Sequence, residues 1–210
     1  MPAKSGLLLF MGRNKDFDEN EVLKKAVCLF WDRGYNGTSM QDLVDGLGIS
    51  RSSLYDTFGD KHQLYLKALK AYQQGYGSQM CTLIREAPSA KAAIRGLLEL
   101  VVSELLGDKQ RKGCFMVNAG IELGTHDIEV SGLICQNERQ LEDAFLKVIR
   151  QGLESGELDQ YKDPKALARF LGNTVKGLQV SVKSTTEKAF FEDVIRTALT
   201  TLDNAAHKPV

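Results

Sequence analysis

The chain has 210 residues, of which 43% are hydrophobic and 26% are charged, which excludes wholesale disorder and allows a buried core. Its 27 Lys and Arg balance its 27 Asp and Glu, so composition alone gives no sign of a nucleic-acid partner. The four cysteines lack the paired spacing of zinc or redox motifs, and the three histidines are far apart, so neither a metal site nor a cofactor is expected. Scattered thiols without a secretion signal favour a reducing cytoplasm.

The first residues contain an apolar run, from Leu7 to Met11. This run is too short to span a membrane and lacks a signal-peptide cleavage site, so we expect no membrane association. Two readings of the start stay open: residues 1–15 form a disordered arm, or Met11 is an alternative start and residues 1–10 are an upstream extension.

Only 4 Pro and the absence of period-two alternation predict an all-α fold. Asp18 caps a first helix that ends at Gly34. Thr38, paired with Gln41, caps a short second helix. Gly48 supplies a turn, and Ser50 can cap a third helix that runs to about residue 58.

Longer helices are predicted beyond this point. A fourth begins at Asp60 and carries apolar residues to Tyr72. Asp163-Pro164 is a strong start signal, with an acidic cap followed by proline in the first helical position. The further predicted helices cover about residues 89–106, 114–123, 127–154, 163–182 and a last segment around 191–202.

The segment from Thr38 to Phe58 reads as a short amphipathic helix, a glycine turn and a second helix with a polar first turn. Arg51 on that turn is suited to guanine edges or phosphate, and Ser52 and Ser53 can donate hydrogen bonds to either. Residues 11–70 carry nine basic and nine acidic side chains, so a DNA-binding head must sort its charges onto different faces.

This segment resembles the head of TetR-type repressors. The matching elements are Gly48-Ile49-Ser50, Leu54-Tyr55-Asp56-Thr57-Phe58 and Lys61, together with Phe30, Gly34-Tyr35 and Thr38 at the end of the first helix. The resemblance covers about fifty residues. Val44 and Ser52 replace an alanine and a glycine that are frequent there, which leaves the operator sequence open.

The resemblance implies an all-α protein with an N-terminal three-helix head that contains a helix-turn-helix, followed by a larger helical body for ligand binding and dimerisation. The head would occupy residues 16–70 and the body residues 71–210. The implied function is a homodimeric repressor, not an enzyme, that binds a palindromic double-stranded operator and is released by a small-molecule inducer. The expected DNA-binding residues are Thr38, Ser39, Ser50, Arg51, Ser52, Ser53, Tyr55 and Lys61.

Other interpretations of these residues compete with DNA binding. A helix-turn-helix pattern is often just two packed helices, and Tyr55 could be the edge of a core. The positive charge of Lys61 at a helix start is unfavourable beside the positive end of the helix dipole. A contact with a DNA phosphate is therefore the more natural explanation for a lysine there. A helical ligand carrier or small enzyme would keep the body and lose the DNA function.

The body shows no nucleophile–base pair and no glycine-rich phosphate loop, so a ligand cavity between its apolar helices is expected. Its candidate lining residues are Cys114, Phe115, Met116, Asn118, Glu122, His126, Phe145, Phe170, Asn173, Thr174 and Gln179.

Cys114 follows Lys112-Gly113 at a helix start, where a cation and the helix dipole would lower a thiol's pKa. We weigh a reactive sensor against a small buried packing residue. The last two long helices have apolar stripes that include Leu178 and Ile195. These stripes either form a four-helix dimer interface or close the subunit's own core.

Overall fold

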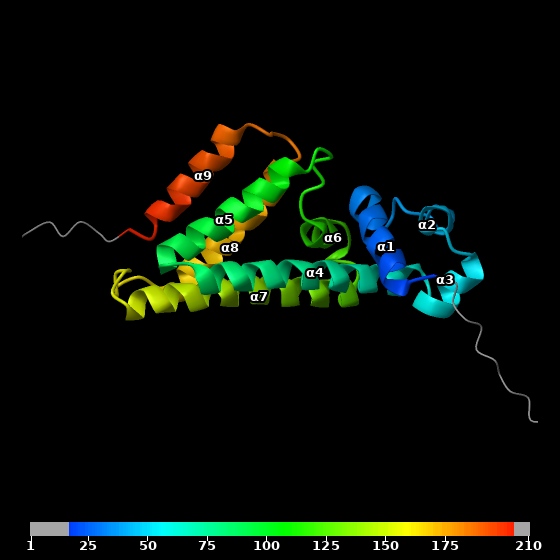
Figure 1. Ribbon diagram of the computed structural model, residues 1–210, viewed down its shortest axis with the longest axis horizontal. Coiled ribbons are helices and arrows are strands. Elements are labelled where there is room, and N and C mark those ends of the chain that lie inside the picture. The colour runs from blue at the N-terminus through cyan, green and yellow to red at the C-terminus, as the bar shows by residue number, and fades with distance from the viewer. Residues whose placement is uncertain (1–16, 204–210) are drawn as a thin grey trace, which may run out of the picture.

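The computed structural model describes residues 17–203, which fold into nine α-helices without a strand in that range (Figure 1). The predicted arm, residues 1–15, and the alternative start at Met11 lie outside the described residues. No helix in the described part is long and apolar enough to cross a membrane. The helices are α1 (Glu19–Arg33), α2 (Met40–Leu47), α3 (Arg51–Phe58), α4 (Lys61–Glu86), α5 (Ala90–Gly107), α6 (Phe115–Leu123), α7 (Ile128–Glu154), α8 (Pro164–Ser181) and α9 (Lys188–Thr200).

Short polar side chains set most of the helix starts. Asp18, Ser50, Asp60 and Asp163 each accept a hydrogen bond from a backbone N–H in the first turn of the helix that follows. Such a cap satisfies a donor that the helix leaves unpaired. These four starts confirm the predicted ones.

The start of α2 differs from the prediction. Ser39, not Thr38, is the N-cap, and it forms a capping box with Asp42. Thr38 is fully buried, and its hydroxyl donates to the Gly34 carbonyl oxygen at 2.6 Å. The side chain of Thr38 therefore closes the turn that follows α1, and Asp42 replaces Gln41 as the partner in the capping pair.

The α-helices gather into a small head at one end and a longer body (Figure 1). Helices α1, α2 and α3 cluster around the start of α4, which continues without a break along the body beside α7. The body packs α5, α7, α8 and α9 around a core that includes Leu98, Phe145, Leu171 and Phe191, all 0% exposed.

Helix α6 packs into the core of the head. Phe115 and Ala119 belong to the same buried cluster as Phe30 and Leu54. The Tyr65 ring of α4 lies between them, with its centroid 5.0 Å from that of Phe30 and 5.6 Å from that of Phe115. The division of the chain near residue 70 stays a prediction, but the buried core of the head extends past it to include α6.

Candidate nucleic-acid interface and ligand cavity

A glycine turn sets the angle between α2 and α3. Gly48 caps the end of α2 in the left-handed conformation, with φ 70° and ψ 28°, and its N–H donates to the Val44 carbonyl oxygen. A residue with a side chain rarely adopts this conformation. Ile49 and Leu54, both buried, then anchor α3 against the head core. The result is a helix-turn-helix whose second helix is fixed along its inner face.

The outer face of α3 is polar and accessible. Arg51, Ser52 and Tyr55 are all exposed, and Tyr55 has 46% of its surface accessible. Because residues three and four apart share one helix face, these side chains lie together. Arg51 forms no ion pair with any residue between 17 and 203, so its guanidinium is available to a partner.

Three serine hydroxyls meet at the start of α3. The Ser50 hydroxyl oxygen accepts from the Ser53 N–H and lies 3.0 Å from the Ser52 hydroxyl oxygen and 2.9 Å from that of Ser53. Ser50 and Ser52 are exposed, and Ser53 is half-buried. This end of α3 therefore presents hydroxyl groups and backbone N–H groups on the surface, as an anion-binding helix start does.

Several acidic side chains of the head are committed to local contacts. Asp18 and Asp60 accept from backbone N–H groups as helix caps. Asp42 accepts from the backbone of Ser39 and pairs with Arg33 at 2.7 Å. These hydrogen bonds hold the pKa of the Asp42 carboxyl below its ordinary value, with the Ser39 hydroxyl as the largest cause. These acidic groups thus hold the helices, whereas Arg51 has no ion-pair partner among residues 17–203.

Two lysines near α3 have partners within the protein. The Lys61 ammonium lies 4.2 Å from the centroid of the Tyr35 ring, which provides the cation–π contact expected of such a pair. The Lys67 ammonium donates to the carbonyl oxygens of Thr57 and Phe58 at the end of α3, each at 3.3 Å. The ammonium groups of Lys61 and Lys67 therefore both lie next to the helix-turn-helix.

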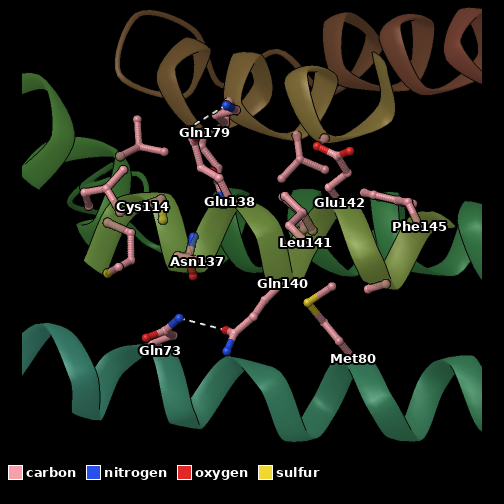
Figure 2. A pocket seen from close by; sticks show the side chains of 18 of the residues that line it. Gln73, Met80, Cys114, Asn137, Glu138, Gln140, Leu141, Glu142, Phe145 and Gln179 are labelled. Carbon is pink, nitrogen blue, oxygen red and sulfur yellow. Dashed lines mark hydrogen bonds and ion pairs between the residues drawn. The ribbon is translucent and has the colours of Figure 1, made fainter. Parts of the chain in front are cut away.

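The body contains a cavity of about 1190 Å³ bounded by α4, α5, α6, α7 and α8. Figure 2 shows Gln73 and Met80 on α4 facing Asn137 and Gln140 on α7. The Gln73 side-chain N–H donates to the side-chain Oε1 of Gln140 at 2.7 Å. This bridge joins the two long helices at the cavity.

Apolar side chains from all five helices form much of the wall, among them Leu97, Val101, Leu141 and Phe145. The charged groups between α7 and α8 are paired with each other. Lys176 donates to Glu138 at 2.8 Å, and Arg169 lies 3.4 Å from Glu142. These pairs cancel most of the charge on that wall.

The sequence-predicted lining residues divide into two groups. Cys114, Met116, Phe145, Asn173 and Gln179 line the cavity. The other predicted residues do not line it. Phe115 is buried in the core of the head, the Asn118 side chain donates to the Lys112 carbonyl oxygen, and Glu122 contacts the turn after α1. His126 and Phe170 are exposed, Phe170 to 46%, and the Thr174 hydroxyl donates to the Phe170 carbonyl oxygen. Each of these side chains serves a different contact or faces solvent.

Sequence reasoning missed the lining from α4, α5 and the middle of α7. Gln73, Met80 and Ile84 on α4 are separated by seven and four residues, and Asn137, Gln140, Leu141 and Ala144 on α7 occupy positions i, i+3, i+4 and i+7. This spacing places each set on one helix face. The signal was present in the sequence, but the polar members resemble an ordinary solvent face until the facing helix is known.

The structure does not support an activated Cys114 thiol. Cys114 is 7% exposed, and burial is the main cause that raises its pKa. The Lys112 ammonium lies over the Trp31 ring, 4.8 Å from its centroid, and 3.7 Å from Asp108, so it is engaged elsewhere. The Tyr72 hydroxyl donates to the Cys114 sulfur at 3.7 Å. These contacts favour the packing residue over the sensor.

The geometry defines a helix-turn-helix DNA-binding regulator with a hollow helical body. Residues 22–68 match the family model of the bacterial regulatory proteins, tetR family, and residues 90–198 match that of the tetracyclin repressor-like C-terminal domain. The chain therefore belongs to the TetR family of transcriptional regulators. This membership confirms the prediction of a DNA-binding regulator with a reading head and a ligand-binding body, rather than an enzyme.

Named relatives and solved structures agree with this assignment. The chain is 38% identical over 194 residues to the uncharacterized HTH-type transcriptional regulator YezE of Bacillus subtilis, covering 92% of this chain and 100% of the relative. It is 28% identical to the HTH-type transcriptional repressor ComR of Escherichia coli over 91% of this chain and 90% of that one. A cysteine mutant of the TetR-family regulator CifR, complexed with 26-base-pair operator DNA, superimposes with a TM-score of 0.83 at 28% identity, covering 91% and 100% of the two chains.

The cysteine environments give a labelling order. Cys114 is buried, and burial raises the pKa of its thiol, whereas Cys28, Cys81 and Cys135 are exposed. Because the thiolate is the reactive form, we expect Cys114 to react with a maleimide more slowly than the other three in the folded, ligand-free protein. Time-resolved mass spectrometry of the labelled peptides measures this order. Labelling of Cys114 ahead of Cys28 would restore the sensor hypothesis.

Proposed function

We propose that the protein is a cytoplasmic repressor that binds a palindromic operator as a homodimer and is released when a small molecule occupies its body. The observation that carries this proposal is the exposed face of α3, where Arg51 is unpaired within the described part of the chain and sits beside Ser52 and Tyr55. CifR, which has a similar fold, is bound to operator DNA in its solved structure. A recognition helix presents such side chains to the major groove.

The DNA contacts follow from where each side chain lies. Arg51 and Ser52 at the start of α3 are placed to reach base edges. Ser39 and Ser50, which cap α2 and α3, are exposed and would meet phosphates together with the nearby backbone N–H groups. Ser53, Tyr55 and Lys61 would add phosphate contacts at the edges of the groove. Thr38 has no side-chain role in this proposal because it is fully buried.

Exposed stripes on α8 and α9 support a dimer. On α8, Ala166, Phe170, Asn173, Gly177 and Val180 are exposed and are separated by alternating steps of four and three residues. This is the spacing of a seam that packs against another helix. Phe190 on α9 is 40% exposed, and the half-buried Val194 follows it four residues later.

For the stripes that include Leu178 and Ile195, burial favours the second of the two readings, closure of the subunit's own core. Leu178 is 1% exposed and Ile195 is 6% exposed, and both belong to the core of their own subunit. The neighbouring stripe formed by Phe170, Val180 and Phe190 is the one that a second copy would cover. A symmetric pair of subunits would hold two recognition helices about 34–36 Å apart, one turn of DNA.

The cavity is proposed as the inducer site. Its wall combines apolar side chains with amide groups from Gln73, Asn137 and Gln140, and its charges between α7 and α8 are paired. A mainly apolar molecule with hydrogen-bonding groups suits such a wall. Its occupancy would separate α4 from α7, and α4 leads directly into the head.

The DNA assignment is tested by two substitutions in the head. Arg51→Ala should weaken binding to the selected operator by about 1–3 kcal/mol and relax its sequence preference, because a base-reading side chain is lost. Lys61→Ala should weaken operator and random DNA alike and reduce the salt dependence, because a phosphate contact is lost. Fluorescence anisotropy across a salt series measures both effects. Arg85→Ala, at the far end of α4, is the control, and wild-type binding by both head variants would refute the assignment.

The dimer is tested by placing charge on the exposed stripe without touching the core. Val180→Glu and Phe190→Glu should each raise the dimer dissociation constant by at least about tenfold, because a carboxylate would be buried at the interface. Analytical ultracentrifugation measures the constant, and circular dichroism checks the fold. Lys188→Glu, whose side chain is 78% exposed on α9, is the control. A wild-type chain that stays monomeric at micromolar concentration would contradict the proposal.

The cavity is tested with the neutral apolar dye N-phenyl-1-naphthylamine, whose emission rises in an apolar site. Val101→Trp should lower dye affinity at least about tenfold, because the larger side chain fills the space that it lines. Leu106→Trp is the control, since Leu106 lies on the same helix, is also partly buried and does not line the cavity. Equal dye binding by both variants would place the dye, and the proposed ligand site, elsewhere.

A further inference from the structure

Two carboxylates at the corner between α6 and α7 hold the reading head at two separate points. Glu122 contacts the turn that precedes α2, and Asp127 contacts the first turn of α4, which follows α3. We propose that Glu122 and Asp127 are positioning residues for DNA recognition, which fix the orientation of α2 and α3 on the body. This inference rests on the proposed operator-binding function.

Glu122 binds the backbone of the turn after α1. Its Oε2 accepts from the Tyr35 N–H at 2.9 Å, and its Oε1 accepts from the Asn36 N–H at 2.7 Å. Both oxygens are used, so the carboxylate is held as a fork against two successive amides. A concave run of backbone N–H groups of this kind is an anion site, and here the protein fills it with its own side chain.

Gly34 makes this approach possible. It has φ 75° and ψ 175°, a conformation that side-chain-bearing residues hardly adopt. A Cβ at this position would lie 2.8 Å from the Glu122 Oε2, closer than such atoms come. The Thr38 hydroxyl holds the Gly34 carbonyl oxygen from the other side. The turn is therefore shaped to receive the carboxylate of Glu122.

Asp127 links the starts of α7 and α4. Its Oδ1 accepts from the N–H groups of Glu129 and Val130, each at 3.0 Å, so it caps α7. Its Oδ2 lies 2.6 Å from the His62 Nε2 on α4. The hydrogen bond from the Val130 N–H is the largest cause that lowers the pKa of Asp127.

The two contacts enclose the helix-turn-helix. Asn36 lies just before α2, and His62 lies just after α3, so α2 and α3 are the segment between the two attachment points. A rigid segment fixed at both ends cannot turn without breaking one of the contacts. Both attachment points belong to one corner of the body, five residues apart in the sequence.

Helix α6, which carries Glu122, also lines the cavity. Met116, Val117, Gly120 and Ile121 of α6 line it, and Glu122 is the next residue along. A shift of α6 therefore moves the Glu122 carboxylate against the turn that it holds. Hydrogen bonds to a charged group are stronger than neutral ones, so the loss of one of them changes the orientation of the head.

The test uses the full chain with Glu122→Gln and Asp127→Asn. Glutamine offers one acceptor oxygen where the carboxylate offers two, and asparagine still caps α7 but loses its charge beside His62. Glu99→Gln is the control, because Glu99 is exposed on α5 and its ion pair within residues 17–203 is with Arg95, on the same helix. Fluorescence anisotropy is measured on three DNA duplexes. These are a palindrome selected with the wild-type protein, the same palindrome with one base pair added between its half-sites, and a single half-site.

We expect both variants to lose discrimination between the two half-site spacings by at least about tenfold, with half-site binding within about twofold of wild type. Unchanged spacing discrimination in the variants would overturn the proposal, as would an equal loss on the single half-site. If Glu122→Gln does not fold, Asp127→Asn decides by the same criteria. A wild-type protein that prefers no palindrome over a half-site would instead contradict the proposed function.

Discussion

The packing of α6 inside the head is the constraint on which the arrangement of the molecule depends. Phe115 places its ring against Tyr65 and Tyr72 of α4, with centroids 5.6 Å and 5.7 Å apart. Tyr65 in turn meets Phe30 of α1 edge to face at 5.0 Å. Close-packed interiors shift between discrete arrangements rather than deform smoothly. The three helices of the head thus share one buried cluster with a helix that also lines the cavity.

This constraint connects the two functions of a TetR-family regulator through a short physical path. Helix α6 carries cavity-lining residues in its middle and Glu122 near its end, and α4 carries Gln73 at the cavity and Tyr65 in the head core. Helices α4 and α6 therefore both reach from the cavity into the reading head, as does α7, whose Val130 and Leu133 lie in the head cluster. A ligand acts on the head only if it binds one arrangement of these helices better than the other. The Gln73–Gln140 bridge between α4 and α7 is a contact that occupancy of the cavity would change.

Local features of this fold could be predicted from the sequence, whereas contacts between distant segments could not. The caps Asp18, Ser50 and Asp60 act within three residues of themselves, so their chemistry is visible in the chain. Ser39 and Thr38 are adjacent hydroxyl residues, and only the packing of the turn decides which one caps α2. The position of Glu122 on an apolar helix predicts a cavity residue, but its hydrogen-bond partners, Tyr35 and Asn36, lie 87 and 86 residues away in the sequence. Likewise, proximity in sequence pointed to Lys112 as an activator of Cys114, but the folded chain turns it toward Trp31.

The central claim is that α6 and the three head helices form one cooperative unit. Native-state hydrogen exchange with increasing denaturant measures the opening free energy of each segment. The shared cluster predicts that the slowest amides of α1, at Ala26 and Phe30, and of α6, at Ala119 and Leu123, open with the same free energy and the same denaturant dependence. An α1 that opens at clearly lower free energy, while α6 stays protected with the body, would contradict the account.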